Sequence, residues 1–217
     1  MTEGTAWLAE PRAIAFGGYS VLLARGIGSG ELVARLARAV HGATDSVYSV
    51  YPVGELTSAE LIGLLDDEYD GGHEDIALRH GEDGGWAFVV LYGDWAGGID
   101  DLAPVSRDGA HVFHLEFEEE NGKPVPPQFR YVHDGRLRCA FNLHLDHSWG
   151  SAAVEGDPEV AAPVMELLTA VGLPDETVPH RVAHRTSLEV LERHFGLTLP
   201  RTRILDSALP AAVLEAD

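Results

Sequence analysis

Two ionisable residues in the second half of the chain have the types and the spacing that could support catalysis. His144 and Asp146 stand two residues apart in the segment Asn142–Trp149. In an extended strand, side chains two residues apart point to the same face of a sheet. The carboxylate could then orient the imidazole, so we predict an acid–base pair in which His144 moves a proton and Asp146 positions it.

Two other interpretations of this pair stay open. If the strand continues through it, Asn142 lies on the same face, and two donor atoms at this spacing can bind one metal ion. His111 or His114 on a neighbouring strand could supply a third ligand, but His111 falls on the predicted core face. We therefore assign no metal ligand and specify no cofactor. Polar side chains on the solvent face of a sheet are the simplest alternative.

Three more residues near this segment are candidates for binding. Trp95 and Trp149 adjoin polar loops, and His147 directly follows the acid–base pair. Tryptophan at such a position combines a large apolar ring with a polar N–H, which suits the rim of a ligand pocket or a protein interface. Trp86 differs, because it begins an apolar run and is predicted to lie in the core.

The chain carries none of the specific catalytic motifs. It has no H-E-x-x-H, no G-x-S-x-G and no Walker sequence, so the sequence leaves open whether the protein is an enzyme. Cys139 is the single cysteine, which excludes an intramolecular disulfide and a zinc site built from several cysteines. His180 and His184 have helical spacing, but Pro179 and a helix-start signal at Thr186 favour a loop there.

The chain is strongly acidic, with 15 Lys and Arg against 35 Asp and Glu and a formal net charge of −20. Nucleic acids and anionic membranes repel such a chain, so we expect neither as a partner. The charge permits a basic protein partner, and our leading hypothesis is an acidic protein-interaction module. An immunity-type protein that neutralises a basic toxin is one concrete version. The alternative is a small-molecule-binding protein or an enzyme that uses the His/Asp site; the oligomeric state is left open.

Two sequence features bear on location. The N-terminal residues MTEGTAWLAEPR have neither a basic region nor an apolar core of the kind that signal peptides carry. The longest apolar runs, such as residues 87–92, are too short to span a bilayer. The sequence therefore predicts a cytoplasmic protein.

Helix signals and strand signals occupy different parts of the chain. Ser29 precedes an apolar stripe, Thr57 and Glu60 form a capping box, and Asp157 stands before a proline, so each marks a helix start. Short β-branched and aromatic runs dominate the middle, and Asp134-Gly135 is a type I′ hairpin signal. We predict an α+β fold: a mainly antiparallel sheet with helices packed on one face and a helical C-terminal segment.

The C-terminal part is predicted to be helical. Helices are expected over residues 187–195 and 203–209, and the tail 211–217 is expected to fray. We predict a single α+β domain over residues 1–217, with a possible helical subdomain over residues 150–217.

Several turn and core segments together resemble one protein family. The segments are Gly85-Trp86, Val105–Gly109, Phe129–Tyr131, Asp134–Arg136, Gly156–Pro158, Leu168–Gly172 and Leu191–Leu199. They resemble an actinobacterial domain-of-unknown-function family, well over residues 90–210 and loosely over 14–90. The resemblance implies an aromatic-rich sheet and a C-terminal helix, and it brings no activity with it. The chain departs from the family at Arg107-Asp108, which is more charged, and at His194-Phe195.

Overall fold

A computed structural model describes residues 3–14, 18–39, 48–68, 76–93, 99, 101–118, 125–146 and 153–216. Its strands are β1 (Gly18–Arg25), β2 (Tyr48–Leu56), β3 (Ile76–Asp83), β4 (Trp86–Gly93), β5 (His111–Glu118), β6 (Val125–His133), β7 (Arg136–Asn142), β8 (Glu155–Gly156) and β9 (Leu209–Ala216). Its helices are the 3-10 helix η1 (Ala6–Ala9) and the α-helices α1 (Ser29–Ala39), α2 (Ser58–Glu68), α3 (Pro158–Ala170), α4 (His180–Phe195) and α5 (Arg201–Asp206).

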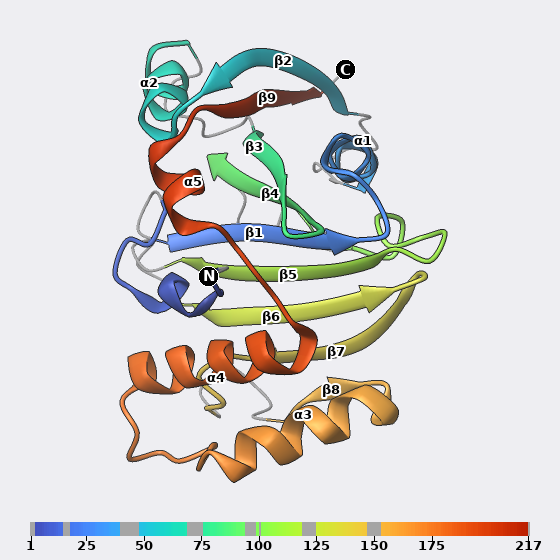
Figure 1. Ribbon diagram of the computed structural model, residues 1–217, viewed down its shortest axis with the longest axis vertical. Helices are drawn as coiled ribbons and strands as arrows, with labels where there is room; N and C mark the ends of the chain where they lie inside the picture. Colours follow the sequence, from blue (N-terminus) through green and yellow to red (C-terminus); the bar gives the residue numbers. More distant parts are fainter. Residues whose placement is uncertain are drawn as a thin grey trace.

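The strands form one antiparallel sheet in the order β2-β9-β3-β4-β1-β5-β6-β7-β8 (Figure 1). Strands β3 and β4, and strands β6 and β7, are adjacent in the sheet and are joined by tight hairpins. Asp134 and Gly135 both have positive φ at the tip of the second hairpin, as the type I′ signal predicts. The predicted α+β class with a mainly antiparallel sheet is confirmed.

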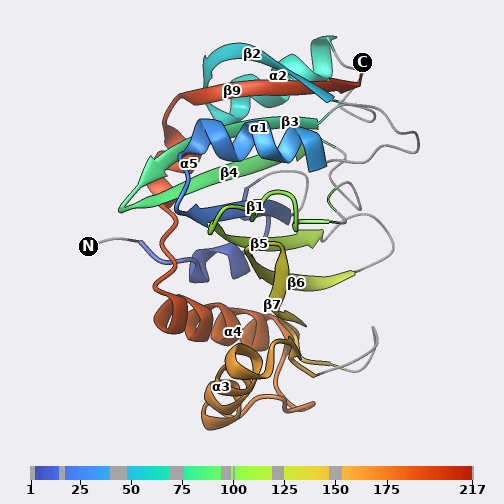
Figure 2. The same cartoon turned by 90° about the vertical axis from the view of Figure 1, so that its right-hand side faces the viewer.

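Both faces of the sheet are covered. Alternate residues of the central strands point to opposite sides, so Val21 and Leu23 enter one core while Leu22 and Ala24 enter the other. The larger core lies under η1, α2, α3, α4 and α5, whereas α1 covers the second face (Figures 1 and 2). The prediction that the helices pack on one face of the sheet therefore holds for every described helix except α1, which packs on the other face.

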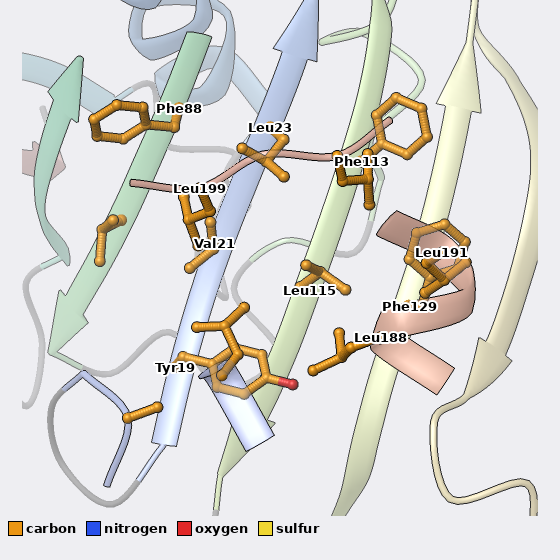
Figure 3. Close-up of a cluster of buried hydrophobic side chains, with 14 of the residues drawn as sticks. Tyr19, Val21, Leu23, Phe88, Phe113, Leu115, Phe129, Leu188, Leu191 and Leu199 are labelled. Atoms are coloured by element: carbon orange, nitrogen blue, oxygen red, sulfur yellow. The ribbon is translucent and has the colours of Figure 1, made fainter. Parts of the chain in front are cut away.

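The larger core is rich in aromatic side chains. Phe113 stacks on Tyr131 with ring centroids 4.3 Å apart, and Phe195 from α4 contacts both rings. Figure 3 shows Leu188 and Leu191 of α4 on the same side of the sheet as Phe113 and Phe129. The labelled residues are Tyr19, Val21, Leu23, Phe88, Phe113, Leu115, Phe129, Leu188, Leu191 and Leu199. This packing fixes α4 over strands β1, β5 and β6.

Local capping signals begin two helices where they were expected. Thr57 and Glu60 form the capping box: the Glu60 carboxylate accepts from the Thr57 N–H at 2.8 Å, and the Thr57 hydroxyl accepts from the Glu60 N–H at 3.3 Å. Asp157 caps α3 by accepting from the Glu159 N–H at 2.9 Å. No helix within the described ranges is both long and apolar enough to cross a bilayer.

The C-terminal residues differ from the prediction. The last helix is α5, which ends at Asp206, and the tail that was expected to fray forms β9. Strand β9 lies between β2 and β3 and pairs with both. Its backbone groups are satisfied by partners far away in the sequence, and Val213 and Leu214 enter opposite cores. Local signals could not predict this pairing.

Arg79, a buried arginine on β3, connects β3 to neighbouring elements by hydrogen bonds. Arg79 on β3 has no exposed surface and donates to the carbonyls of Leu56, Ile204 and Ser207 at 2.9, 2.8 and 2.5 Å. It also donates to the Tyr92 hydroxyl at 2.9 Å. A buried cation is tolerated only when its donors are paired, so Arg79 joins β2, β3, β4 and the α5 end into one unit.

Candidate functional site

A small cavity lies where the end of β7, the start of α4, the end of β5 and the segment after η1 meet. Its volume is about 190 Å³. The lining residues are Ala9, Glu10, Pro11, Phe117, His144, His180, Arg181 and His184. Three of these eight are histidines from two separate parts of the chain. The cavity therefore brings together ionisable groups that the sequence keeps far apart.

A turn, and not a strand, positions the predicted acid–base pair. Strand β7 ends at Asn142, and the chain then turns through Leu145, whose φ is +53°. The Asn142 side chain closes the turn: its carbonyl oxygen accepts from the Asp146 N–H at 3.3 Å, and its amide donates to the Asp146 carbonyl at 3.2 Å. The assumption that the strand continues to Asp146 is wrong, because the asparagine side chain replaces the ladder partners of Asp146.

Helix α4 supplies two more histidines. The helix begins at His180, directly after Pro179, so residues 180–184 are helical and not the loop that was predicted. A proline at the boundary is compatible with this start, because the first helical residues need no internal N–H partner. His180 and His184 are one turn apart on the same face, and both line the cavity.

Three donor atoms converge at the mouth of the cavity. The Asp146 Oδ2 lies 3.2 Å from the Nε2 of His180 and 3.8 Å from the Nδ1 of His144. All three donor atoms are within 4.8 Å of one another. The two imidazole rings stack with centroids 4.5 Å apart and an interplanar angle of 15°. His180 is 66% exposed, whereas His144 is 12% exposed, so the cluster runs from the surface to the interior.

A second, deeper contact fixes His184. Its Nε2 lies 2.6 Å from the Tyr19 hydroxyl, and both residues are buried. Which of the two groups donates the proton in this contact depends on the tautomer of the His184 ring. Burial raises the pKa of Tyr19, with a further contribution from the Glu116 charge, which keeps the hydroxyl protonated. The ring of His184 also meets His144 edge-on at 5.9 Å.

Burial keeps the inner histidines neutral. It lowers the pKa of His144 to about 4, with His180 adding to the effect and Asp146 opposing it. It lowers the pKa of His184 to about 3, with a smaller contribution from His144. Removing an imidazolium from water costs free energy that a neutral ring does not pay. At neutral pH both rings are therefore neutral, and His144 offers a lone pair to a ligand.

Charged side chains complete the cavity wall. Arg181 is exposed beside His180, and its Nε donates to the Ala9 carbonyl at 3.2 Å. Glu10 forms a two-bond ion pair with Arg201, at 2.7 and 3.0 Å. The Arg201 charge thus compensates Glu10, and Arg181 adds a positive group at the opening.

Comparison with known proteins identifies a family. A family model described as a family of unknown function, DUF6461, matches residues 2–202, nearly the whole chain. The chain belongs to the DUF6461 family. This confirms the predicted membership of a family of unknown function. Neither a search of curated proteins nor a search of solved structures finds a match for this DUF6461 chain.

The DUF6461 structure brings together part of the predicted site. The Nδ1 of His144 lies 3.8 Å from the Oδ2 of Asp146, which is beyond hydrogen-bond distance, and the same carboxylate oxygen lies 3.2 Å from His180. Trp95, His147 and Trp149 lie outside the described residues. His114 lies elsewhere: it is buried on the α1 side of the sheet, with its Nε2 3.0 Å from the Ser20 hydroxyl.

Sequence reasoning set aside two residues of the DUF6461 site. His180 and His184 were placed in a loop because Thr186 resembled the start of a later helix. Thr186 is inside α4, and the i, i+4 spacing of the two histidines was the signal that could have identified them. His111, the other candidate third ligand, stacks instead on His133 with ring centroids 3.9 Å apart, and its Nδ1 lies 2.7 Å from the Tyr131 hydroxyl.

Proposed function

We propose that this DUF6461 protein binds a divalent transition metal ion of the Zn²⁺ type through His144, Asp146 and His180, and uses it on a small molecule in the adjacent cavity. The observation that carries the proposal is the convergence of two imidazole nitrogens and one carboxylate oxygen within 4.8 Å. Imidazole and carboxylate together are a common ligand set for Zn²⁺.

The donor distances support a shared ion. Two ligands, each about 2.0–2.1 Å from a tetrahedral Zn²⁺, lie roughly 3.3 Å from each other. The separations of Asp146 from His180 and His144 are 3.2 and 3.8 Å. The two rings are stacked, and a metal ion lies in the plane of each imidazole that binds it, so one ring must turn out of the stack to close the set. His180 is the residue that would move most easily, because it is 66% exposed.

The surroundings of the ligands also favour metal binding. A metal ligand must be deprotonated, and burial lowers the pKa of His144 to about 4. Two hydrogen bonds between the Asn142 side chain and the Asp146 backbone hold Asp146 in place. They limit the positions that the Asp146 carboxylate can take. The metal interpretation of the sequence lacked the right third ligand, because that donor comes from α4, 34 residues after Asp146.

Three protein ligands are typical of a catalytic metal site, which keeps one position for water or substrate. The neighbouring cavity of about 190 Å³ has room for a small substrate only. Arg181 at its opening would attract a negatively charged group. We therefore propose metal-assisted chemistry, of which hydrolysis is the simplest case, on a small anionic substrate.

The competing acid–base interpretation fits the same residues less well. An efficient general base has a pKa near the working pH. A pKa of about 4 leaves His144 with little tendency to accept a proton at neutral pH. The same low pKa does not weaken a metal ligand, since that role needs only the lone pair.

Isothermal titration of the purified full chain with ZnCl₂ tests the proposal, with competition by a chromophoric chelator for tight binding. We expect one equivalent to bind. His144→Ala, Asp146→Asn and His180→Ala should each weaken binding by at least roughly tenfold to 100-fold. His194→Ala is the matched control, because His194 is an exposed histidine in the last turn of the same helix.

The outcome is informative in either direction. His180→Ala is the cleanest variant, since an exposed side chain can be removed with little effect on folding. If this variant and His194→Ala bind Zn²⁺ as the parent does, His180 is not a ligand and the metal centre is refuted. Circular dichroism of each variant separates a lost ligand from a lost fold.

A further inference from the structure

An open groove runs along α3 beside β8 and shares no lining residue with the histidine cavity. Its volume is about 770 Å³. Figure 1 shows α3 beside β8 at the end of the sheet. The groove is lined largely by apolar and small side chains from these two elements, among them Val154, Gly156, Pro158, Ala162, Met165 and Thr169. It thus offers an apolar floor next to an edge strand.

Helix α3 packs on the protein through one narrow stripe. Its buried residues are Ala161, Val164 and Leu168. On the groove side of the helix Ala162 is exposed and Met165 is half-buried, although apolar side chains gain free energy when they leave water. The helix therefore carries more apolar surface than its contacts with the rest of the described chain cover.

The chain segment that carries the groove is rich in carboxylates. Residues 153–178 contain no Lys or Arg, and their carboxylates are Glu155, Asp157, Glu159, Glu166, Asp175 and Glu176. Glu159 and Glu166 are seven residues apart, so they lie on the same stripe of α3, along the groove. Asp157 forms an ion pair with Arg138 at 3.0 Å, so it is compensated within the protein. Glu166 lines the groove, and with Glu159 on the same stripe it gives the apolar floor a negative rim.

We propose that this groove binds a basic amphipathic helix of a partner protein. An amphipathic helix places its apolar face in such a groove, and Lys or Arg beside that face would meet the acidic rim. A second copy of this chain fits poorly, because it would bring one negative rim against another at a net charge of −20 each. The proposal is independent of the metal centre.

A model peptide provides the probe. It consists of about 14 residues of Leu and Lys, with Leu at i, i+3, i+4 and i+7, and its length of roughly 20 Å matches α3. Fluorescence anisotropy of the labelled peptide reports binding to the full chain, in buffer with EDTA so that no metal contributes. A peptide of the same composition with scrambled order loses the apolar face and serves as the first control.

Variants of the full chain locate the binding surface. Glu166→Lys reverses a rim charge, and Ala162→Gln puts a bulkier polar side chain on the exposed floor of the groove. Asp67→Lys is the matched control, since Asp67 is an exposed carboxylate on the distant helix α2 and the change in net charge is identical. We expect Glu166→Lys and Ala162→Gln each to weaken peptide binding about fivefold to tenfold, and Asp67→Lys to change it less than about twofold.

The controls decide between local recognition and general charge attraction. Tighter binding of the patterned peptide than of the scrambled one, together with a larger effect of Glu166→Lys than of Asp67→Lys, supports the groove. Equal binding of the two peptides, or equal effects of the two charge reversals, overturns it, because the attraction then comes from net charge alone. Circular dichroism confirms that each variant is folded.

Discussion

Stability should fall steeply as the pH drops from 7.5 to 5.5, because three buried histidines resist protonation. The pKa values of His114 and His184 are lowered to about 3, and that of His144 to about 4, mainly by burial. In the unfolded chain a histidine has a pKa near 6.5. Below pH 6.5 the unfolded state therefore binds more protons than the folded state, and the equilibrium shifts towards unfolding.

The size of the effect follows from the proton difference. Between pH 7.5 and 5.5, each histidine that stays neutral in the fold lowers the free energy of unfolding by about 1.4 kcal/mol. Three such residues give about 4 kcal/mol, a large part of the 5–15 kcal/mol typical of a domain. Relief of the repulsion within an acidic chain opposes this loss, whereas the pKa values of His80 and His111, which burial also lowers, add to it. About 4 kcal/mol is therefore the contribution of the three buried rings alone.

Urea unfolding at both pH values, with EDTA present, measures the loss. His114→Gln and His184→Gln remove one titrating group each, so each variant should lose about 1.4 kcal/mol less than the parent over this pH range. His194→Gln is the control, since His194 is exposed. A parent that loses less than about 1 kcal/mol, or a double variant with the parent's full loss, would show that these histidines do protonate in the folded chain.

Three further predictions concern the stability of the fold and the accessibility of its cysteine. Arg79→Met should lower the free energy of unfolding by about 3 kcal/mol in urea titration, because the Ile204 and Ser207 carbonyls lose their buried donor; Arg79→Lys should lose less. Cys139 is fully buried and burial raises its pKa to about 12, so Ellman's reagent should label it only after unfolding. Asp157→Ala should cost about 1 kcal/mol in thermal unfolding, through the lost cap of α3.

Local signals predicted the features that local chemistry decides. The capping box of Thr57 and Glu60 begins a helix because both partners lie within four residues. The Asp134-Gly135 turn likewise adopts the positive φ angles that its two residue types favour, and it joins two strands that are adjacent in the sequence. These signals, together with the alternation of apolar residues in strands such as His111–Glu118, were sufficient for the fold class.

Features that depend on distant contacts were not accessible in this way. Residues 209–216 form a strand because they pair with both β2 and β3, which lie far away in the sequence. The sequence around Leu209 carries no local signal for this pairing. The site behaves similarly. The pair His144 and Asp146 was predicted from its spacing, whereas the approach of His180 requires the packing of α4 on the sheet. Two of the three donor residues are thus close in the sequence, whereas His180, the third, belongs to a different helix.

The position of β9 has a consequence for biosynthesis. Strand β2 has β9 as its one neighbour in the sheet, and Leu56 pairs with Leu209, about 150 residues later. A ribosome that adds about 5–20 residues per second needs roughly 8–30 s to cover that distance. During this interval the growing chain holds an unpaired strand edge, which is open to pairing with other nascent chains. Production of this protein should therefore benefit from a low expression level, or from chaperones that shield such edges until β9 has been made.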